Sequence, residues 1–191
     1  MAEAFFQATA WTMDTPKPYG AFHLVLTVLG VSLSIFLARK FSFPERKAGP
    51  DTILFLCGLF LGLTELYKQG FIYYIENGRT YDWWYFPFQL CSVPMYLGLF
   101  IPMVPARIRN VFYLFIQDFG LLGGIMALAE PSGLMHPYWT MTVHGFLWHF
   151  NLIFMGLICA FYNLKTETPK SYLHTIPLFL FCTAIATAVN V

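Results

Sequence analysis

Charged side chains are scarce in this 191-residue chain, at 11% of all residues, whereas apolar residues make up 58%. A soluble domain carries about 25% charged residues, because its surface must be hydrated. The low charge therefore excludes an ordinary soluble domain and predicts an integral membrane protein. The formal net charge is only +1, so the composition does not indicate a nucleic-acid partner.

Several familiar site motifs are also missing. The sequence contains no CxxC or HExxH spacing, whereas a zinc site takes three or four Cys, His or carboxylate ligands. It also lacks a glycine-rich phosphate loop and a GxSxG nucleophile elbow. We therefore expect neither a metal nor a diffusible cofactor. The N-terminal segment has no basic start followed by an apolar core, so it does not predict a cleaved signal peptide.

Long apolar runs dominate the rest of the chain. Six of them, bounded by turn or charge signals, lie at 19–39, 52–75, 84–103, 110–129, 138–162 and 172–191. Each has roughly the 20 residues that a helix needs to cross a bilayer, and a helix satisfies its own backbone there. The sequence predicts an all-α bundle of six transmembrane helices over 19–191, after an extracellular N-terminal segment, 1–18. Because the last run reaches the end of this chain, the sequence leaves open whether a longer protein would contain a seventh helix.

Basic residues predict the orientation of this bundle. Among the connections between the runs, the second holds only Arg79 and the fourth holds no Lys or Arg. The first, third and fifth connections hold Arg39, Lys40, Arg46, Lys47, Arg107, Arg109, Lys165 and Lys170. Under the positive-inside rule the odd connections are cytoplasmic, which places the N-terminus of this multi-pass cell-membrane protein outside.

Ionisable residues are embedded in the apolar runs, where an unpaired charge costs about 3 kcal/mol or more and usually marks a function. They include Cys91, His144, Glu65 and Asp118. Counted from the outer helix ends, Cys91 lies about 10 Å deep, His144 about 9 Å, and the two carboxylates about 15 and 16 Å. A thiol and an imidazole at one level are the two parts of an activated nucleophile, and a carboxylate below can orient the imidazole.

Structural roles are the alternatives for these residues. A membrane cysteine is often a small core hydrophobe, as we expect for the cysteines other than Cys91. A membrane histidine such as His144 also hydrogen-bonds a carbonyl across a helix interface. Glu65 and Lys68 are three residues apart on one helix face, so they can simply neutralise each other.

Helical periodicity gives expectations for the neighbours of His144. His149 follows it by five residues, about 140° around a helix, so the two are not expected to share a site. Asn151 follows by seven residues and returns to the face of His144. Two small-residue motifs, Gly58-x-x-x-Gly62 and Gly120-x-x-x-Gly124, indicate close helix packing and no chemistry.

The segment Phe86-Pro87-Phe88-Gln89-Leu90-Cys91-Ser92 resembles a motif of the YwaF-like family of bacterial integral membrane proteins, whose third helix carries a Leu-Pro-Leu-His-Leu-Cys type motif. The segment Thr142-Val143-His144-Gly145 is similar to the His-Gly segment of that family, and Glu65 falls where it has a second-helix acidic residue. The family is related to an animal transmembrane acyltransferase that remodels phospholipid acyl chains, in which a Cys and a His are implicated. The resemblance implies that these are Cys91 and His144. Gln89 replaces the usual motif histidine, which leaves His144 alone as the base.

The first functional hypothesis is a membrane-embedded acyltransferase or lipid hydrolase. Cys91, deprotonated by His144, would attack an acyl ester of a membrane phospholipid, and the acyl group would pass to a lysophospholipid or to water. Asp118 or Glu65 would orient the imidazole, and Gln89 or the amide groups after Pro87 would stabilise the oxyanion.

The alternative is a non-enzymatic protein that binds or transports a small solute. Buried polar residues and aromatic residues would then hold the ligand in a pocket that is reached from the water. The candidate substrate-binding residues are Gln89, Trp84 and Asn151. The sequence does not predict the oligomeric state.

Overall fold

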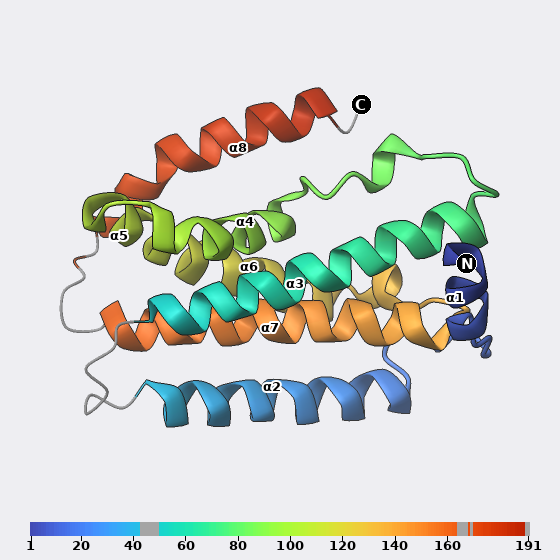
Figure 1. The fold of residues 1–191 in the computed structure, drawn as a ribbon. Coiled ribbons are helices and arrows are strands. Elements are labelled where there is room, and N and C mark those ends of the chain that lie inside the picture. Colours follow the sequence, from blue (N-terminus) through green and yellow to red (C-terminus); the bar gives the residue numbers. More distant parts are fainter. Residues whose placement is uncertain (43–49, 164–167, 169, 190–191) are drawn as a thin grey trace.

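The computed structural model describes residues 1–42, 50–163, 168 and 170–189 (Figure 1). Within this part of the chain the regular structure is helical, and the one β-type contact is an isolated bridge between Thr12 and Tyr138. The all-α prediction is therefore confirmed. Three basic residues behind the predicted orientation, Arg46, Lys47 and Lys165, lie outside the described residues.

The α-helices within the described residues are α1 (Ala2–Thr9), α2 (Ala21–Phe41), α3 (Asp51–Phe71), α4 (Val93–Phe100), α5 (Ala106–Phe115), α6 (Leu121–Ala129), α7 (Trp139–Asn163) and α8 (Ile176–Val189). Short π-helical segments extend α3 and join α5 to α6: η1 (Ile72–Glu76) and η5 (Ile116–Gly120). Short 3-10 segments are η2 (Trp83–Tyr85), η3 (Leu90–Ser92), η4 (Ile101–Met103), η6 (Pro131–Leu134) and η7 (Ser171–Thr175).

Four helical runs in the described part of the chain are long and apolar enough to cross a membrane. They are Ala21–Phe41, Ala106–Ala129, Trp139–Asn163 and Ser171–Val189. These runs correspond to the first, fourth, fifth and sixth predicted spans, with ends that differ by a few residues. Apolar side chains on the outer face of α2, such as Val28 and Leu29, are more than 60% exposed. Such a face fits lipid as its solvent rather than water.

The two remaining predicted spans differ from these four. The second, 52–75, is one helical run through α3 and η1, but Glu65 and Lys68 in its second half reduce its apolar character. The third, 84–103, is not one helix, because the chain is non-helical from 86 to 89 and the next helix begins at Leu90. Pro87 accounts for the break, since proline removes a backbone donor and disfavours helix at the preceding residue. The resulting apolar helix, Leu90–Met103, is shorter than a membrane span.

The helices pack around α7, which Figure 1 shows between α2 and α3, and α4 runs along the other side of α3. The largest buried cluster includes Leu61 of α3, Leu97 of α4 and Met155 of α7. α8 lies at the edge of the bundle, where Phe179 stacks on Phe119 of η5 with 4.7 Å between ring centroids. The core therefore lies among α3, α4 and α7, and α8 presents most of its surface outward.

A close approach of α3 and α4 depends on two glycines. A Cβ atom on Gly58 would lie 2.8 Å from the backbone nitrogen of Leu99, and one on Gly98 would lie 2.7 Å from the carbonyl oxygen of Leu54. The first predicted small-residue motif is thus used for packing at Gly58. At Gly62, in contrast, an added Cβ would make only an ordinary contact, at 3.7 Å.

We expect Gly58→Ala to lower the free energy of unfolding by about 1–3 kcal/mol, because the added methyl group would overlap backbone atoms of α4. Gly62→Ala, one turn further along α3, is the matched control and should change stability by less than about 0.5 kcal/mol. Thermal unfolding of both variants in one detergent measures the difference. Equal losses in the two variants would contradict this account of the α3–α4 contact.

The two ends of the bundle differ in character. One end holds basic residues that close α2 and open α5: Arg39, Lys40, Arg107 and Arg109. There Asp51, at the start of α3, accepts hydrogen bonds from Arg109 and from the hydroxyl of Tyr113, which links α3 to α5. The opposite end holds the N-terminus, α1 and the start of α7 (Figure 1).

The N-terminal segment packs on this opposite end. Glu3 of α1 forms an ion pair with Arg79, and the hydroxyl of Tyr67 donates to Oγ1 of Thr9 at 2.6 Å. The backbone N–H of Trp139 donates to the carbonyl oxygen of Trp11 at 2.9 Å. The first residues of the chain therefore cover the junction between the end of α3 and the start of α7.

Candidate functional site

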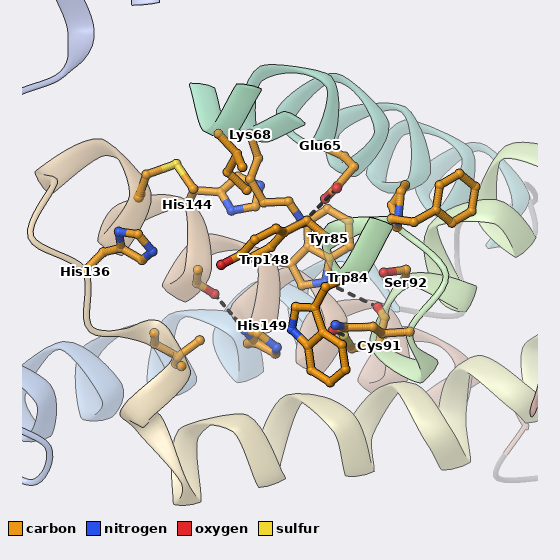
Figure 2. Close-up of a pocket in the computed structure, with 18 of the residues that line it drawn as sticks. Glu65, Lys68, Trp84, Tyr85, Cys91, Ser92, His136, His144, Trp148 and His149 are labelled. Atoms are coloured by element: carbon orange, nitrogen blue, oxygen red, sulfur yellow. Dashed lines mark hydrogen bonds and ion pairs between the residues drawn. The ribbon is translucent and has the colours of Figure 1, made fainter. Parts of the chain in front are cut away.

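One pocket, of about 450 Å³, lies between α3, the segment 84–92, the loop 132–136 and α7. Cys91 and His144 both line it, together with Glu65, Gln89 and Trp84. The structure thus gathers five of the seven residues that the sequence marks as candidates around a single cavity (Figure 2).

The other two candidates lie elsewhere. Asp118 is in η5, where Nε2 of Gln117 lies 3.4 Å from its Oδ1, and it is not part of the pocket lining. Asn151 donates from Nδ2 to the carbonyl oxygen of Cys57 at 3.3 Å and lines a separate apolar cavity. Depth along a helix and helical period are therefore not sufficient to predict which residues share a pocket. Neither of them identifies the neighbouring helix that a side chain contacts.

Cys91 lies in the first turn of the helix Leu90–Met103, not about 10 Å along a helix as counting from the predicted span suggests. Gln89, which precedes this helix, has an extended backbone with φ −78° and ψ 163°. Sγ of Cys91 lies 3.9 Å from Oε1 of Gln89. The first backbone N–H groups of a helix have no partner within it, and with the helix dipole they favour negative charge. Reactive cysteines are often found in this position.

Two histidines of α7 line the pocket. The ring of His144 packs on that of Trp148, with 5.6 Å between centroids, and Nε2 of His144 is buried without a hydrogen-bond partner. Nδ1 of His149 lies 2.7 Å from the carbonyl oxygen of Gly145. A carbonyl can only accept a hydrogen bond, so Nδ1 of His149 carries the proton and Nε2 keeps the lone pair.

The presence of His149 in the pocket differs from the expectation that it would be separated from His144. The angle of about 140° between them holds for an ideal helix, but the pocket extends around α7 and the His149 ring folds back toward Gly145. A Cβ atom on Gly124 of α6 would lie 3.0 Å from the backbone oxygen of His149, and one on Gly123 would lie 3.9 Å from Cβ of Cys91. Gly124 therefore lets α6 approach the backbone of His149, whereas a side chain at Gly123 would make only an ordinary contact with Cys91, so Gly124 is the sequence signal that bears on His149.

Glu65 and Lys68 form a pair in the wall of the pocket. Glu65 is buried, and Oε1 lies 2.7 Å from Nζ of Lys68 and 2.7 Å from Nε2 of Gln69. Glu65 and Lys68 therefore form the ion pair that the sequence predicts as the alternative to a functional role. Gln69 also donates to the carbonyl oxygen of Tyr85 at 2.6 Å, which ties α3 to the segment that covers the pocket. Lys68 itself lines the cavity, so its charge faces the enclosed space.

Further contacts hold the pocket walls together. The indole N–H of Trp148 donates to the carbonyl oxygen of Cys91 at 3.3 Å, which connects α7 to the start of the Leu90–Met103 helix. Nδ1 of His136 lies 3.3 Å from Oε1 of Glu76 and connects the loop 132–136 to η1. Among the described residues, no group of three or more His, Cys, Asp or Glu side chains is arranged to hold a metal ion.

A comparison with protein families finds a match over most of the chain. The model of the TMEM164 family, a family of transmembrane proteins, matches residues 18–191. No curated protein and no solved structure matches the chain. The family match and the four long apolar helices agree that this is a membrane protein.

Proposed function

This chain belongs to the TMEM164 family, and we propose that it is a membrane-embedded acyltransferase or lipid hydrolase with a cysteine nucleophile. One observation carries the proposal: a cysteine in the first turn of a helix lines the same cavity as two histidines of α7. A thiol and an imidazole around one cavity are the components of covalent acyl transfer. A membrane phospholipid is the substrate class that reaches a site among apolar helices.

The reaction has two steps with one imidazole as base and acid. In the first, the imidazole takes the thiol proton of Cys91 while sulfur attacks the ester carbonyl carbon. The carbon–oxygen ester bond then breaks, and the imidazolium returns its proton to the leaving oxygen, which releases a lysophospholipid. In the second, the imidazole takes the proton of a lysophospholipid hydroxyl, or of water, while that oxygen attacks the thioester carbonyl carbon. The carbon–sulfur bond then breaks, and the imidazolium returns the proton to the thiolate of Cys91.

We assign the role of this base to His149. The carbonyl oxygen of Gly145 holds its Nδ1–H and leaves Nε2 as the proton acceptor. In this arrangement a backbone carbonyl takes the place of the orienting carboxylate in a nucleophile–base–orienter set. His144, the base that the sequence predicts, lines the same cavity and is the second candidate.

The oxyanion of the tetrahedral intermediate needs donors close to Cys91. We assign this role to the backbone N–H groups of the first helical turn, at Leu90 and Cys91, and to the side-chain amide of Gln89. The Gln89 side chain lies next to the sulfur, with its acceptor atom Oε1 3.9 Å from Sγ of Cys91, and the donor to an oxyanion would be the Nε2 end of the same amide. Asp118 and Asn151 lie outside the pocket lining and have no part in this mechanism.

The orientation and the number of spans complete the proposal. We propose that α3–η1 and the segment 83–103, in which a non-helical stretch precedes the short helix Leu90–Met103, also cross the cell membrane, which with the four long apolar helices gives six crossings. The basic end, with Arg39, Lys40, Arg107 and Arg109, faces the cytoplasm under the positive-inside rule. The N-terminus and the pocket then lie toward the outer leaflet.

The thioester intermediate provides the direct test. Purified protein incubated with a phospholipid that carries a labelled acyl chain should bind the label at Cys91 through a bond that hydroxylamine cleaves. Mass spectrometry of the intact protein and of its peptides measures the amount and the position of the label. Addition of a lysophospholipid should move the label into diacyl lipid for a transferase, whereas free fatty acid should dominate for a hydrolase.

Cys57→Ala is the matched control, because Cys57 lines a separate cavity and should not affect labelling. The mechanism would be excluded if the wild-type protein formed no acyl-enzyme. It would also be excluded if Cys57→Ala lost the label. Non-enzymatic binding or transport of a small solute would then be the better account of the pocket.

A further inference from the structure

A second cavity, of about 280 Å³, lies on the other side of His144. It is formed between Thr64 and Tyr67 of α3 and the side chains of α7 from Trp139 to Leu147, and Trp11 lies over it. The α7 residues in its wall span about 12 Å at 1.5 Å per residue. We call this cavity the α3–α7 groove.

Four of the polar groups that line the α3–α7 groove are already used within the protein. The hydroxyls of Thr64, Tyr67 and Thr140 and the indole N–H of Trp11 each donate to a protein oxygen, at 2.6 to 3.1 Å. A ligand in this groove therefore meets mainly apolar surface, and a polar ligand would lose hydrogen bonds to water without replacement. The lining selects an apolar ligand.

The surroundings of the groove point to the membrane as the source of that ligand. Leu66 of α3 is 70% exposed and Leu147 of α7 is 46% exposed. α7 is one of the four helices long and apolar enough to span a bilayer. Exposed leucines on such helices are in contact with acyl chains, so an acyl chain enters the groove from the side without crossing water.

His144 joins the groove to the pocket of Cys91, because it lines both cavities. Its Nε2 atom is buried and has no hydrogen-bond partner, which is costly unless a ligand supplies one. The apolar cavity around Cys57 and Asn151 shares no lining residue with the pocket. Of these two apolar cavities, the α3–α7 groove is therefore the one that borders the pocket lined by Cys91.

We propose that the α3–α7 groove binds the acyl chain of the phospholipid whose ester Cys91 attacks. This inference rests on the proposed function and names the part of the substrate that each cavity takes. The ester and the headgroup lie in the polar pocket, and the first part of the acyl chain lies against Val143 and Leu147. His144 stands at the boundary, where a water molecule that accompanies the lipid can donate a hydrogen bond to Nε2.

A bulky residue in the groove tests this assignment. Val143→Trp should lower the rate of acyl transfer from a phospholipid with 16-carbon chains by about tenfold or more, because the indole occupies the path of the chain. Transfer from a soluble phospholipid with short chains should change little, since its chain hardly enters the groove. Leu180→Trp, on the exposed face of α8, is the matched control and should leave both rates unchanged.

Photocrosslinking gives a readout that does not depend on turnover. A phospholipid with a diazirine in the middle of its acyl chain, bound to Cys91→Ala protein, should attach to α3 near Tyr67 or to α7 near Leu147. Mass spectrometry of the peptides locates the attachment. Crosslinks at Phe41 or Phe154, which line the cavity around Cys57 and Asn151, would overturn the inference. Crosslinks spread evenly over the outer surface would do the same.

The two proposals fail separately. Crosslinks in the groove without any thioester in the wild-type protein would support lipid binding in the groove and would exclude the cysteine mechanism. A thioester at Cys91 with no change of chain-length preference in Val143→Trp, and with crosslinks elsewhere, would exclude only the groove.

Discussion

Cys91→Ser is expected to lower the rate of acyl transfer on the order of 10³-fold or more, as for loss of the nucleophile in other covalent acyl-transfer sites. Serine is close to cysteine in size, so the first turn of the Leu90–Met103 helix should be kept. A hydroxyl is far less acidic than a thiol, however, and a single imidazole tuned to a thiol activates it poorly. Initial rates with labelled phospholipid and added lysophospholipid measure the loss.

The matched control for this substitution is Cys57→Ser, in a cysteine that lies outside the pocket. Its rate should stay close to that of the wild-type protein. A wild-type rate in Cys91→Ser, with no acyl-enzyme at any time, would mean that the pocket does not work through a cysteine thioester.

His149→Gln is expected to lower the rate by about 10² to 10⁴-fold, the usual contribution of a general base. Glutamine keeps a donor for the carbonyl oxygen of Gly145 but cannot take a proton from the thiol of Cys91. His144→Gln should cost less, because His144 then acts at the boundary with the α3–α7 groove and not on the sulfur. His174→Gln, an exposed residue of η7, is the control and should not change the rate.

The pH profile gives these variants a second readout. A base must be neutral to accept a proton, so wild-type kcat/KM should rise with pH as the imidazole loses its proton. This rising limb should disappear in His149→Gln and persist in His144→Gln. The reverse pattern would assign the base to His144, as the sequence predicts.

Composition and the length of apolar runs were sufficient to predict the class of the protein and four of its membrane helices. The runs 19–39 and 138–162 correspond to α2 (Ala21–Phe41) and α7 (Trp139–Asn163) with shifts of two residues or fewer. These features can be read locally, because the transfer of a helix into hydrocarbon depends on its own side chains and its own backbone. The pairing of Glu65 with Lys68 was also predictable, since three residues separate neighbours on any helix.

The composition of the pocket was predictable only in part. The resemblance around Cys91 and His144 marked two residues that do line one cavity. The sequence could not show that His149 joins them, that Cys91 opens a helix, or that Asp118 and Asn151 face other parts of the bundle.

These remaining features depend on the rotation of each helix about its axis and on the helices that it meets. Close contacts between distant segments determine that rotation: Gly58 of α3 against α4, and Gly124 of α6 against the backbone of His149. A periodic pattern in one helix shows which of its faces is apolar and packs in the bundle. It does not show which of the other helices contacts that face. The sequence by itself thus determined a helical membrane protein with a reactive cysteine candidate. Only the tertiary packing decided which imidazoles reach the cavity that the thiol lines, because interhelical contacts and not local periodicity select the neighbours of a side chain.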